Sequence, residues 1–391
     1  MLAKNFASKL APTIRKASNG QSGLNVPRLA GLSILLAGLM LYTGQGWAGS
    51  WQHAVSSRLS TEFDSNPAMS PTYPGSVWRA LFEPSYTLMG RVGADELKAG
   101  LALQIARSSN KTLSQNRDGP SVFLDWLRQS EAGEFGISSR YDEIATRDAG
   151  IDATGLVPED STRASRRLSG SWSKALSERG TLSADGAYEG VAYKGGNYFD
   201  YSTRSGGLRY SYDWSETSTP FLRVSGEKYV PAGSGPSSQL ANVTLGLNWK
   251  AEYVDLTLQA GQSKGSGGNT DLQGGFTAQY TGQRAQLVLS ADRQVSSSGL
   301  GGFVKADHAR GNWNYTLSER SNTGIDLDWS KNRSVTTNNV RTTSGVWLQR
   351  NLNPFWGVRT YYQHNIINGG GVDGASSNIL GLSLVYTHSD F

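Results

Sequence analysis

The stretch Asn242–Gln259, NVTLGLNWKAEYVDLTLQ, decides the fold class. Apolar residues alternate with polar ones on both sides of a short polar turn, Lys250-Ala251-Glu252. The apolar series comprises Val243, Leu245, Leu247 and Trp249 before the turn, and Val254, Leu256 and Leu258 after it. A period of two over 8 to 10 residues, interrupted by a tight turn, predicts two antiparallel β-strands, each with one apolar and one polar face.

The same period recurs along the chain on either side of this hairpin. Short polar turns alternate with mostly longer segments rich in Gly, Ser, Asn and Pro, such as 64–75, 108–120 and 146–162. Tight turns on one side and longer loops on the other are typical of transmembrane barrels. We predict a single antiparallel β-barrel over residues 49–391 with about 18 strands (16–18). The strands are expected to start near residues 51, 76, 95, 121, 133, 163, 179, 202, 217, 239, 252, 269, 282, 301, 322, 340, 354 and 376.

The first 48 residues have the pattern of a secretory signal peptide. Five basic residues and no acidic residue precede the apolar run 29–42, and Gly46-Trp47-Ala48 places small residues at the two positions that a signal peptidase recognises. The alternative is a membrane anchor, but the run is shorter than the roughly 20 residues a spanning helix needs. We therefore expect cleavage after Ala48.

Composition narrows the function classes. The chain has 37 Lys+Arg and 32 Asp+Glu, and five of the basic residues lie in the signal, which leaves 32 against 32 after cleavage. This balance does not predict a nucleic-acid-binding face. The chain has no cysteine, and its four histidines are scattered, so we expect no metal and no cofactor. Asp307-His308 is the best catalytic pair, but adjacent strand residues point to opposite faces, so no enzyme is predicted.

Charged residues at mid-strand predict a polar lumen, because an Arg or Lys facing hydrocarbon costs roughly 2–4 kcal/mol near the midplane. Both signs are mixed, which suits neutral or weakly charged, hydroxyl-rich solutes as well as an ordinary polar lumen. The candidate lumen-lining residues are Arg140, Asp142, Arg167, Asp185, Glu189, Arg209, Asp213, Arg223, Asp255, Arg284, Asp326, Asp328 and Arg359.

Aromatic residues recur shortly before the tight turns and are expected to form a girdle at one membrane interface, where amphipathic rings are favoured. These residues are Trp172, Trp214, Trp249, Tyr280, Tyr315 and Trp347. The terminal Phe391 resembles the assembly signal of outer-membrane barrels, although its parity differs from that of the preceding apolar series. The expected partners are therefore outer-membrane lipid or lipopolysaccharide and the barrel-assembly machinery.

The region from Ser76 to Tyr193 contains SVWRALFEPSYTL, ELKAGLALQIARSSN, SVFLDWLRQSEAGEFGISSRYDE and WSKALSERGTLSADGAYEGVAY. It resembles a family of bacterial outer-membrane barrels that accompany exopolysaccharide export clusters of the Wzx/Wzy type. The resemblance implies an exit pore that works with a periplasmic polysaccharide-export partner.

Three functions follow from the sequence as hypotheses. The first is a channel in the outer membrane of a Gram-negative bacterium that lets an exopolysaccharide out. The alternatives are a general porin for small hydrophilic solutes and a non-conducting barrel that acts as a scaffold or sheath for a partner complex. An even number of strands places both termini on the periplasmic side.

Overall fold

The computed structural model describes residues 50–131, 133–146, 161–196, 198–333, 338–369 and 374–389. The chain divides into two compact units, Met1–Ala48 and Gly49–Phe391, and every described residue belongs to the second. The predicted signal peptide and Phe391 lie outside the described residues, so both remain predictions.

The second unit is an 18-stranded sheet, as predicted. Its strands are β1 (Ser50–Asp64), β2 (Val77–Val92), β3 (Asp95–Ser108), β4 (Arg117–Ser130), β5 (Gly133–Ala145), β6 (Thr162–Ala175), β7 (Gly180–Lys194), β8 (Tyr201–Tyr212), β9 (Ser218–Pro231), β10 (Ser238–Lys250), β11 (Val254–Gly265), β12 (Thr270–Thr281), β13 (Ala285–Ser298), β14 (Gly302–Ser318), β15 (Ser321–Arg333), β16 (Asn338–Asn351), β17 (Trp356–Gly369) and β18 (Ala375–Ser389). The predicted starts agree closely, and the largest difference is at β4, which begins at Arg117 rather than near residue 121.

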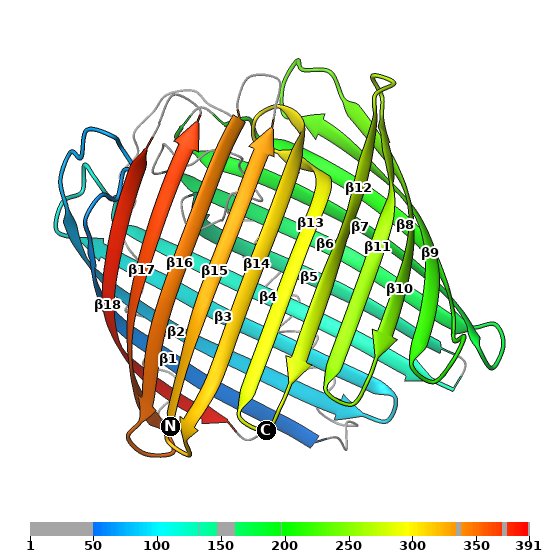
Figure 1. Ribbon diagram of the computed structural model, residues 1–391, viewed down its shortest axis with the longest axis horizontal. Helices are drawn as coiled ribbons and strands as arrows, with labels where there is room; N and C mark the ends of the chain where they lie inside the picture. The colour runs from blue at the N-terminus through cyan, green and yellow to red at the C-terminus, as the bar shows by residue number, and fades with distance from the viewer. Residues whose placement is uncertain are drawn as a thin grey trace, which may run out of the picture. The chain divides into compact units, whose positions relative to one another are not determined.

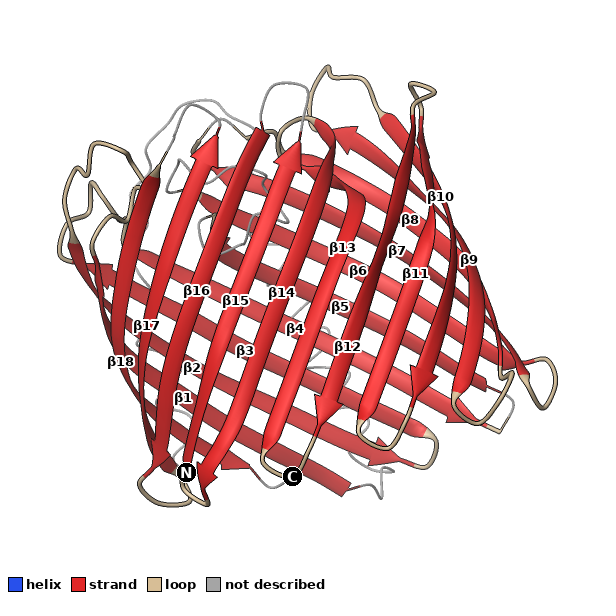
Figure 2. Ribbon diagram, in the orientation of Figure 1, coloured by secondary structure: helices blue, strands red, loops and turns tan. Residues whose placement is uncertain are grey.

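Each strand pairs antiparallel with the next one, and β1 pairs with β18, so the sheet closes into a barrel (Figures 1 and 2). The closing seam runs from Ala54 opposite Ser389 to Asp64 opposite Ile379 without a break. Closure pairs the backbone of both terminal strands, which a lipid environment requires because no water is present there to satisfy free N–H and C=O groups. No helix in the described part of the chain is long and apolar enough to cross a membrane.

The connections differ at the two ends of the barrel. At one end the strands are joined by tight turns, such as 93–94, 176–179, 251–253 and 319–320. The β2–β3 turn needs Gly93, whose φ of 58° lies in the left-handed region that favours glycine. At the other end lie the longer segments 65–76 and 109–116, together with the short connections 266–269 and 299–301. We call these the tight-turn end and the loop end.

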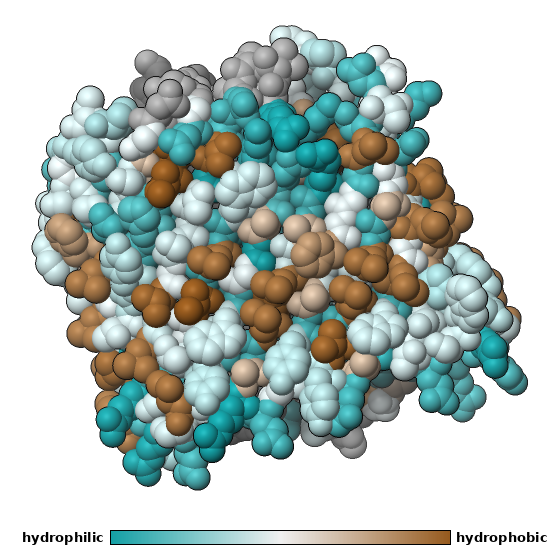
Figure 3. Space-filling view, viewed as in Figure 1, coloured by the Kyte–Doolittle hydropathy of each residue, from teal (hydrophilic) through white to brown (hydrophobic). Residues whose placement is uncertain are grey.

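The outward face carries an apolar belt. Large side chains at alternate positions are exposed, among them Leu101, Leu208, Leu245, Leu327 and Leu380. Figure 3 shows apolar side chains spread in a band across one side of the barrel, with polar side chains above and below it. A belt of this kind on a closed barrel is the surface that faces lipid in a transmembrane protein.

Candidate functional site: the inner wall and its crossing hairpin

The inward face holds most of the candidate lumen residues. Directly paired residues on neighbouring strands point to the same face of a sheet. Ser60 on β1 points inward, so its partners on β18 and β2, and their partners in turn, identify the inward residues of each strand, which form a polar series. The structure places on this face Arg140, Asp142, Arg167, Asp185, Glu189, Arg209, Arg223, Asp255, Asp326, Asp328 and Arg359. Asp255 lies at the tight-turn end of β11, and the others lie farther along their strands.

Asp213 and Arg284 lie in tight turns and not on the inner wall. β8 ends at Tyr212, and Asp213 accepts a hydrogen bond of 2.9 Å from the Thr219 hydroxyl at the turn. Arg284 precedes the first residue of β13, Ala285. The alternation of apolar and polar residues continues in the sequence after the last residue of β8 and before the first residue of β13. The sequence pattern therefore predicts longer strands here than the structure has.

Trp347 points into the barrel, whereas it was expected at the membrane interface. Its neighbours Val346 and Leu348 are both 47% exposed on the outward face, so the residue between them must point inward. The other expected girdle residues lie differently. Trp172, Trp249, Tyr280 and Tyr315 are on outward positions near the tight turns, and Trp214 is in the β8–β9 turn.

Four inward aromatic rings lie flat across a glycine on the neighbouring strand. The directly paired residues are Phe123 with Gly100, Phe221 with Gly246, Trp347 with Gly324, and Tyr361 with Gly381. In each pair, a Cβ built on the glycine would stand 2.2–2.6 Å from the ring. The missing side chain is therefore what allows the ring to lie against the wall. Phe123 and Phe221 were not among the lumen residues expected from the sequence.

Cationic side chains lie over three of these rings. The guanidinium carbon of Arg209 is 3.7 Å from the ring centre of Phe221, and that of Arg359 is 4.2 Å from Trp347. Arg140 lies 5.8 Å from Phe123. Each cation–π contact contributes about 0.5–2 kcal/mol, depending on how far it is desolvated. The stacks hold planar charged groups on the wall, so these groups do not extend freely into the lumen.

Most of the remaining inward charges are paired. Arg223 contacts Asp185 at 2.8 Å, Arg310 contacts Asp328 at 2.8 Å, and Arg163 contacts Glu189 at 2.8 Å. Pairs of this kind lower the excess of either sign along the wall, and a strongly ion-selective pore needs such an excess.

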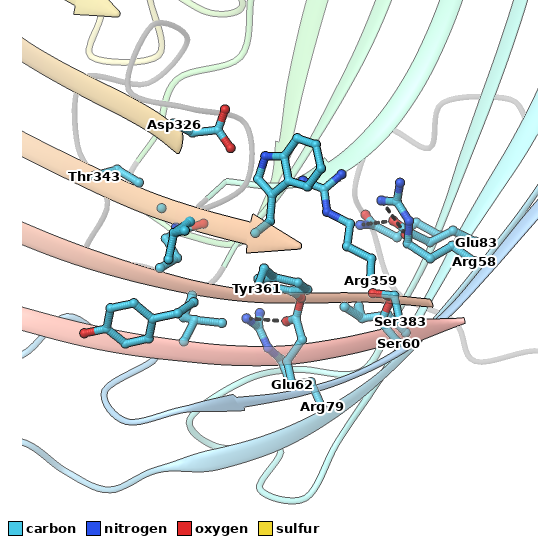
Figure 4. Close-up of a pocket in the computed structure, with 18 residues that line it drawn as sticks. Arg58, Ser60, Glu62, Arg79, Glu83, Asp326, Thr343, Arg359, Tyr361 and Ser383 are labelled. Atoms are coloured by element: carbon cyan, nitrogen blue, oxygen red, sulfur yellow. Dashed lines mark hydrogen bonds and ion pairs between the residues drawn. The ribbon is translucent and has the colours of Figure 1, made fainter. Parts of the chain in front are cut away.

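A pocket of about 360 Å³ lies on the inner wall between β15–β18 and β1–β3 (Figure 4). Arg79 is almost fully buried at its edge and pairs with Glu62 at 2.9 Å, while the Tyr361 hydroxyl donates a hydrogen bond to the same carboxylate. Arg58 pairs with Glu83 at 3.6 Å, and Arg359 projects into the space between them and Asp326 (Figure 4). The pocket thus presents both hydrogen-bond donors and acceptors beside aromatic faces.

The tip of the β13–β14 hairpin leaves the wall and crosses the lumen. β12 extends to Thr270, but its pairing with β13 stops at Gly274 opposite Arg293, while β13 and β14 remain paired up to Ser298 opposite Gly302. Figure 2 shows the loop end of β13 bending away from β12. The five residues 294–298 advance roughly 16 Å at about 3.3 Å per residue. We call residues 294–304 the crossing hairpin.

The crossing hairpin docks on β7–β9, although β10 to β12 separate it from these strands along the wall. The Phe199 amide donates a hydrogen bond of 2.8 Å to the Gly299 carbonyl. Phe303 packs against a cluster of Val191, Tyr201 and Tyr229, of which Tyr229 is completely buried. Buried aromatic packing of this kind contributes more than the surrounding polar contacts, so it anchors the tip.

Polar contacts complete the docking. The Ser297 hydroxyl hydrogen-bonds with Tyr201 and Glu227, and Lys305 pairs with Asp271 of β12. Ser297 and Lys305 belong to the face of the hairpin that continues the outward face of the barrel, yet their partners point inward. This reversal shows that the hairpin has turned into the lumen, where it narrows the loop end.

Comparison with known proteins gives a likeness of fold. No protein-family model matches the sequence, and no curated protein matches it. Among solved structures, Acinetobacter baumannii OccAB4 matches with 12% identity and a TM-score of 0.46, over 88% of this chain and 99% of that one. Pseudomonas aeruginosa opdK has 10% identity and a TM-score of 0.49, over 87% and 99%.

Pseudomonas aeruginosa OccK2 (OpdF), solved in complex with glucuronate, matches with 11% identity and a TM-score of 0.49, over 88% of this chain and 99% of that one. At such identities the likeness concerns the barrel fold and not the solute. None of the comparisons connects the chain with Wzx/Wzy polysaccharide export.

Proposed function

We propose that this protein is an outer-membrane channel for small hydrophilic solutes and that the crossing hairpin limits their size. The observation that carries the proposal is the docking of residues 294–304 on β7–β9 inside a barrel whose wall carries many polar and charged side chains. A barrel of 18 strands is too wide for its wall side chains to fill, so an element that crosses it determines the size of the opening.

The outward belt supports a place in the outer membrane, because antiparallel barrels with tight turns at one end and longer loops at the other are built for that bilayer. In such barrels the tight turns are periplasmic. β1 begins and β18 ends at the tight-turn end, so the start of β1 and the end of β18 lie on the periplasmic side and the crossing hairpin lies toward the outside.

The inner wall supports neutral or weakly charged solutes that carry many hydroxyl groups. Paired charges such as Arg223–Asp185 offer donors and acceptors without a large excess of one sign. The flat stacks of Arg209 on Phe221 and of Arg359 on Trp347 add faces on which a sugar ring could lie. Sugars of one to a few rings fit this combination of groups.

Polysaccharide exit, which the sequence resemblance implies, is the second candidate. Its structural support is the same set of aromatic and guanidinium faces, but a hydrated polymer needs an uninterrupted path. The crossing hairpin obstructs that path as long as it stays docked on Tyr201 and Tyr229. A sheath function requires a partner inside the barrel, and the crossing hairpin occupies space that such a partner needs.

Liposomes containing the purified protein test these alternatives together. We expect mono- and disaccharides to enter and to cause osmotic swelling, while a long dextran stays outside. Passage of the dextran through the unmodified protein would favour polysaccharide exit. Exclusion of every sugar, from protein shown to be folded, would favour the sheath and contradict the proposal.

A further inference from the structure

Three basic side chains, Arg204, Lys228 and Lys264, are exposed on the outward face of β8, β9 and β11 and have no acidic partner within the described part of the chain. Arg204 and Lys228 are directly paired across the strands, and like charges in that position repel each other. The outward positions described on β8 to β12 contain no carboxylate. This arrangement destabilises the sheet unless an anion from outside the chain neutralises it.

Three other cations on the outward face near the loop end have carboxylate partners within the chain. Arg107 pairs with Asp118 at 2.7 Å, and Arg293 pairs with Asp307 at 2.6 Å. Lys194 contacts Glu143 at 2.6 Å. Among the described residues, Arg204, Lys228 and Lys264 lack such a carboxylate, as does the single Arg166 on β6, and the three lie together on β8–β11.

Arg204, Lys228 and Lys264 lie at the level of the edge of the apolar belt that is nearer to the loop end. Lys228 lies ten residues from the first residue of β9, Ser218, and Lys264 lies ten residues from the first residue of β11, Val254. Ten residues span roughly 33 Å along a strand, which a tilt near 40° reduces to about 25 Å along the membrane normal. That distance equals the height of the apolar band of such barrels, so these side chains reach the headgroups of the outer leaflet.

A groove adjoins the basic residues. Gly206, Gly226 and Ala241 form one directly paired row across β8, β9 and β10, and Lys264 continues the row on β11. Arg204, Lys228 and Gln239 form the next row toward the loop end. Lys264, Gly265, Ser266 and Gly268 also line the groove. Glu227 and Leu240 contribute to it as well, but their positions belong to the inward face of the sheet. The basic side chains thus lie on the loop-end side of a row of small residues. This arrangement fits an amphiphile whose anionic head contacts the basic groups and whose apolar chains lie along the small residues.

We propose that Arg204, Lys228 and Lys264 bind the phosphate group of a glycolipid of the outer leaflet, whose acyl chains lie along Gly206, Gly226 and Ala241. Lysine and arginine form charge-assisted hydrogen bonds with phosphate oxygens, and basic pockets on membrane proteins bind lipid headgroups in this way. The inference rests on the outer-membrane placement proposed above, and it concerns the outward face, which takes no part in solute passage.

The test measures lipid retention by the purified barrel in detergent. The probes are a bis-phosphorylated lipid A, the same lipid after enzymatic dephosphorylation, and inorganic phosphate. The variant replaces all three residues, Arg204→Gln, Lys228→Gln and Lys264→Gln. The control is Lys174→Gln, an exposed outward residue near the opposite end of β6. Heat-modifiable gel mobility verifies that each variant is folded.

We expect native mass spectrometry to show phosphorylated lipid A bound to the unmodified protein and to the control. The triple variant should bind it roughly 100-fold more weakly, since each of the three basic residues contributes about fivefold. Equal binding by the triple variant, equal binding of the dephosphorylated lipid, or displacement by millimolar inorganic phosphate would each overturn the inference. Sugar uptake by liposomes containing the triple variant should be unchanged, because the three residues lie on the outward face. Failure of the channel proposal is recognised separately, since the unmodified protein would then show no sugar uptake.

Discussion

The assignment of strand faces is tested most sharply by two neighbouring residues of β11, Leu258 and Gln259. Leu258 is outward and 43% exposed, and Gln259 lies on the inner wall above Gly246 and Gly275. Replacing each by Arg introduces the same charge and volume one residue apart. Only Leu258→Arg places the guanidinium group in hydrocarbon.

The expected cost follows from depth. Leu258 lies four residues beyond the start of β11, roughly 13 Å along the strand and about 10 Å along the membrane normal, which is near the middle of a band about 25 Å tall. Arginine there costs roughly 2–4 kcal/mol of unfolding free energy. Leu256 is two residues closer to the turn, so Leu256→Arg should cost about 1 kcal/mol, because the penalty falls toward the interface.

The assay is reversible urea unfolding of the barrel from phospholipid vesicles, followed by tryptophan fluorescence. We expect the midpoints to fall in the order Gln259→Arg, Leu256→Arg, Leu258→Arg, with the first close to the unmodified protein. Equal loss for Leu258→Arg and Gln259→Arg would show that the two residues face similar surroundings and would refute the face assignment.

Three further predictions concern the inner wall. Gly246→Ala should lower the unfolding free energy by about 1–3 kcal/mol in the same assay, because its Cβ would stand 2.2 Å from the Phe221 ring. Gly345→Ala is the control and should be nearly neutral, since no atom lies nearer than 3.6 Å to its Cβ. Equal effects would contradict the packing of the ring over the glycine. Trp347→Leu should leave membrane yield unchanged but alter channel conductance, because Arg359 loses its stacking partner. Unchanged conductance would show that the stack on Trp347 does not hold Arg359 at the wall. Asp271→Asn should lower the unfolding free energy by at most about 1 kcal/mol, since Lys305 is half exposed. It should increase current fluctuations at low salt and not at roughly 1 M salt, where the ion pair is screened. Steady currents at both salt concentrations would show that this ion pair does not restrain the hairpin.

Much of the fold was predictable because the inward and outward environments differ so strongly. A shift of β10 by one residue would turn Thr244, Gly246 and Asn248 toward lipid in place of Val243, Leu245 and Leu247. Because this would expose polar groups to lipid, the alternating pattern determines the register. The same rule could have placed Trp347 correctly, since Val346 and Leu348 already occupy the lipid side. Its nearness to a tight turn was given more weight than its parity.

The crossing hairpin could not be predicted from the alternation. Residues 294–298, QVSSS, continue the strand pattern of β13, and nothing in them marks the point at which β12 is left behind. The bend depends on partners distant in sequence, namely Phe199, Tyr201 and Tyr229 on the opposite wall. The small residues at 296–299, 301 and 302 are compatible with the bend, but the same composition suits an ordinary loop. The flat packing of Phe123 and Phe221 has the same origin, since it requires a glycine on the neighbouring strand.

Single-channel conductance in planar lipid bilayers tests whether the crossing hairpin is the constriction of an open channel. The comparison is between the unmodified protein and a variant in which residues 294–304 are replaced by a short Gly-Ser turn that joins Arg293 to Lys305. We predict discrete open-channel currents for the unmodified protein and a clearly larger unit conductance for the variant, because the element that narrows the loop end has been removed. Equal conductance in both proteins, or no current from folded unmodified protein, would contradict the account of the crossing hairpin as the constriction of an open channel.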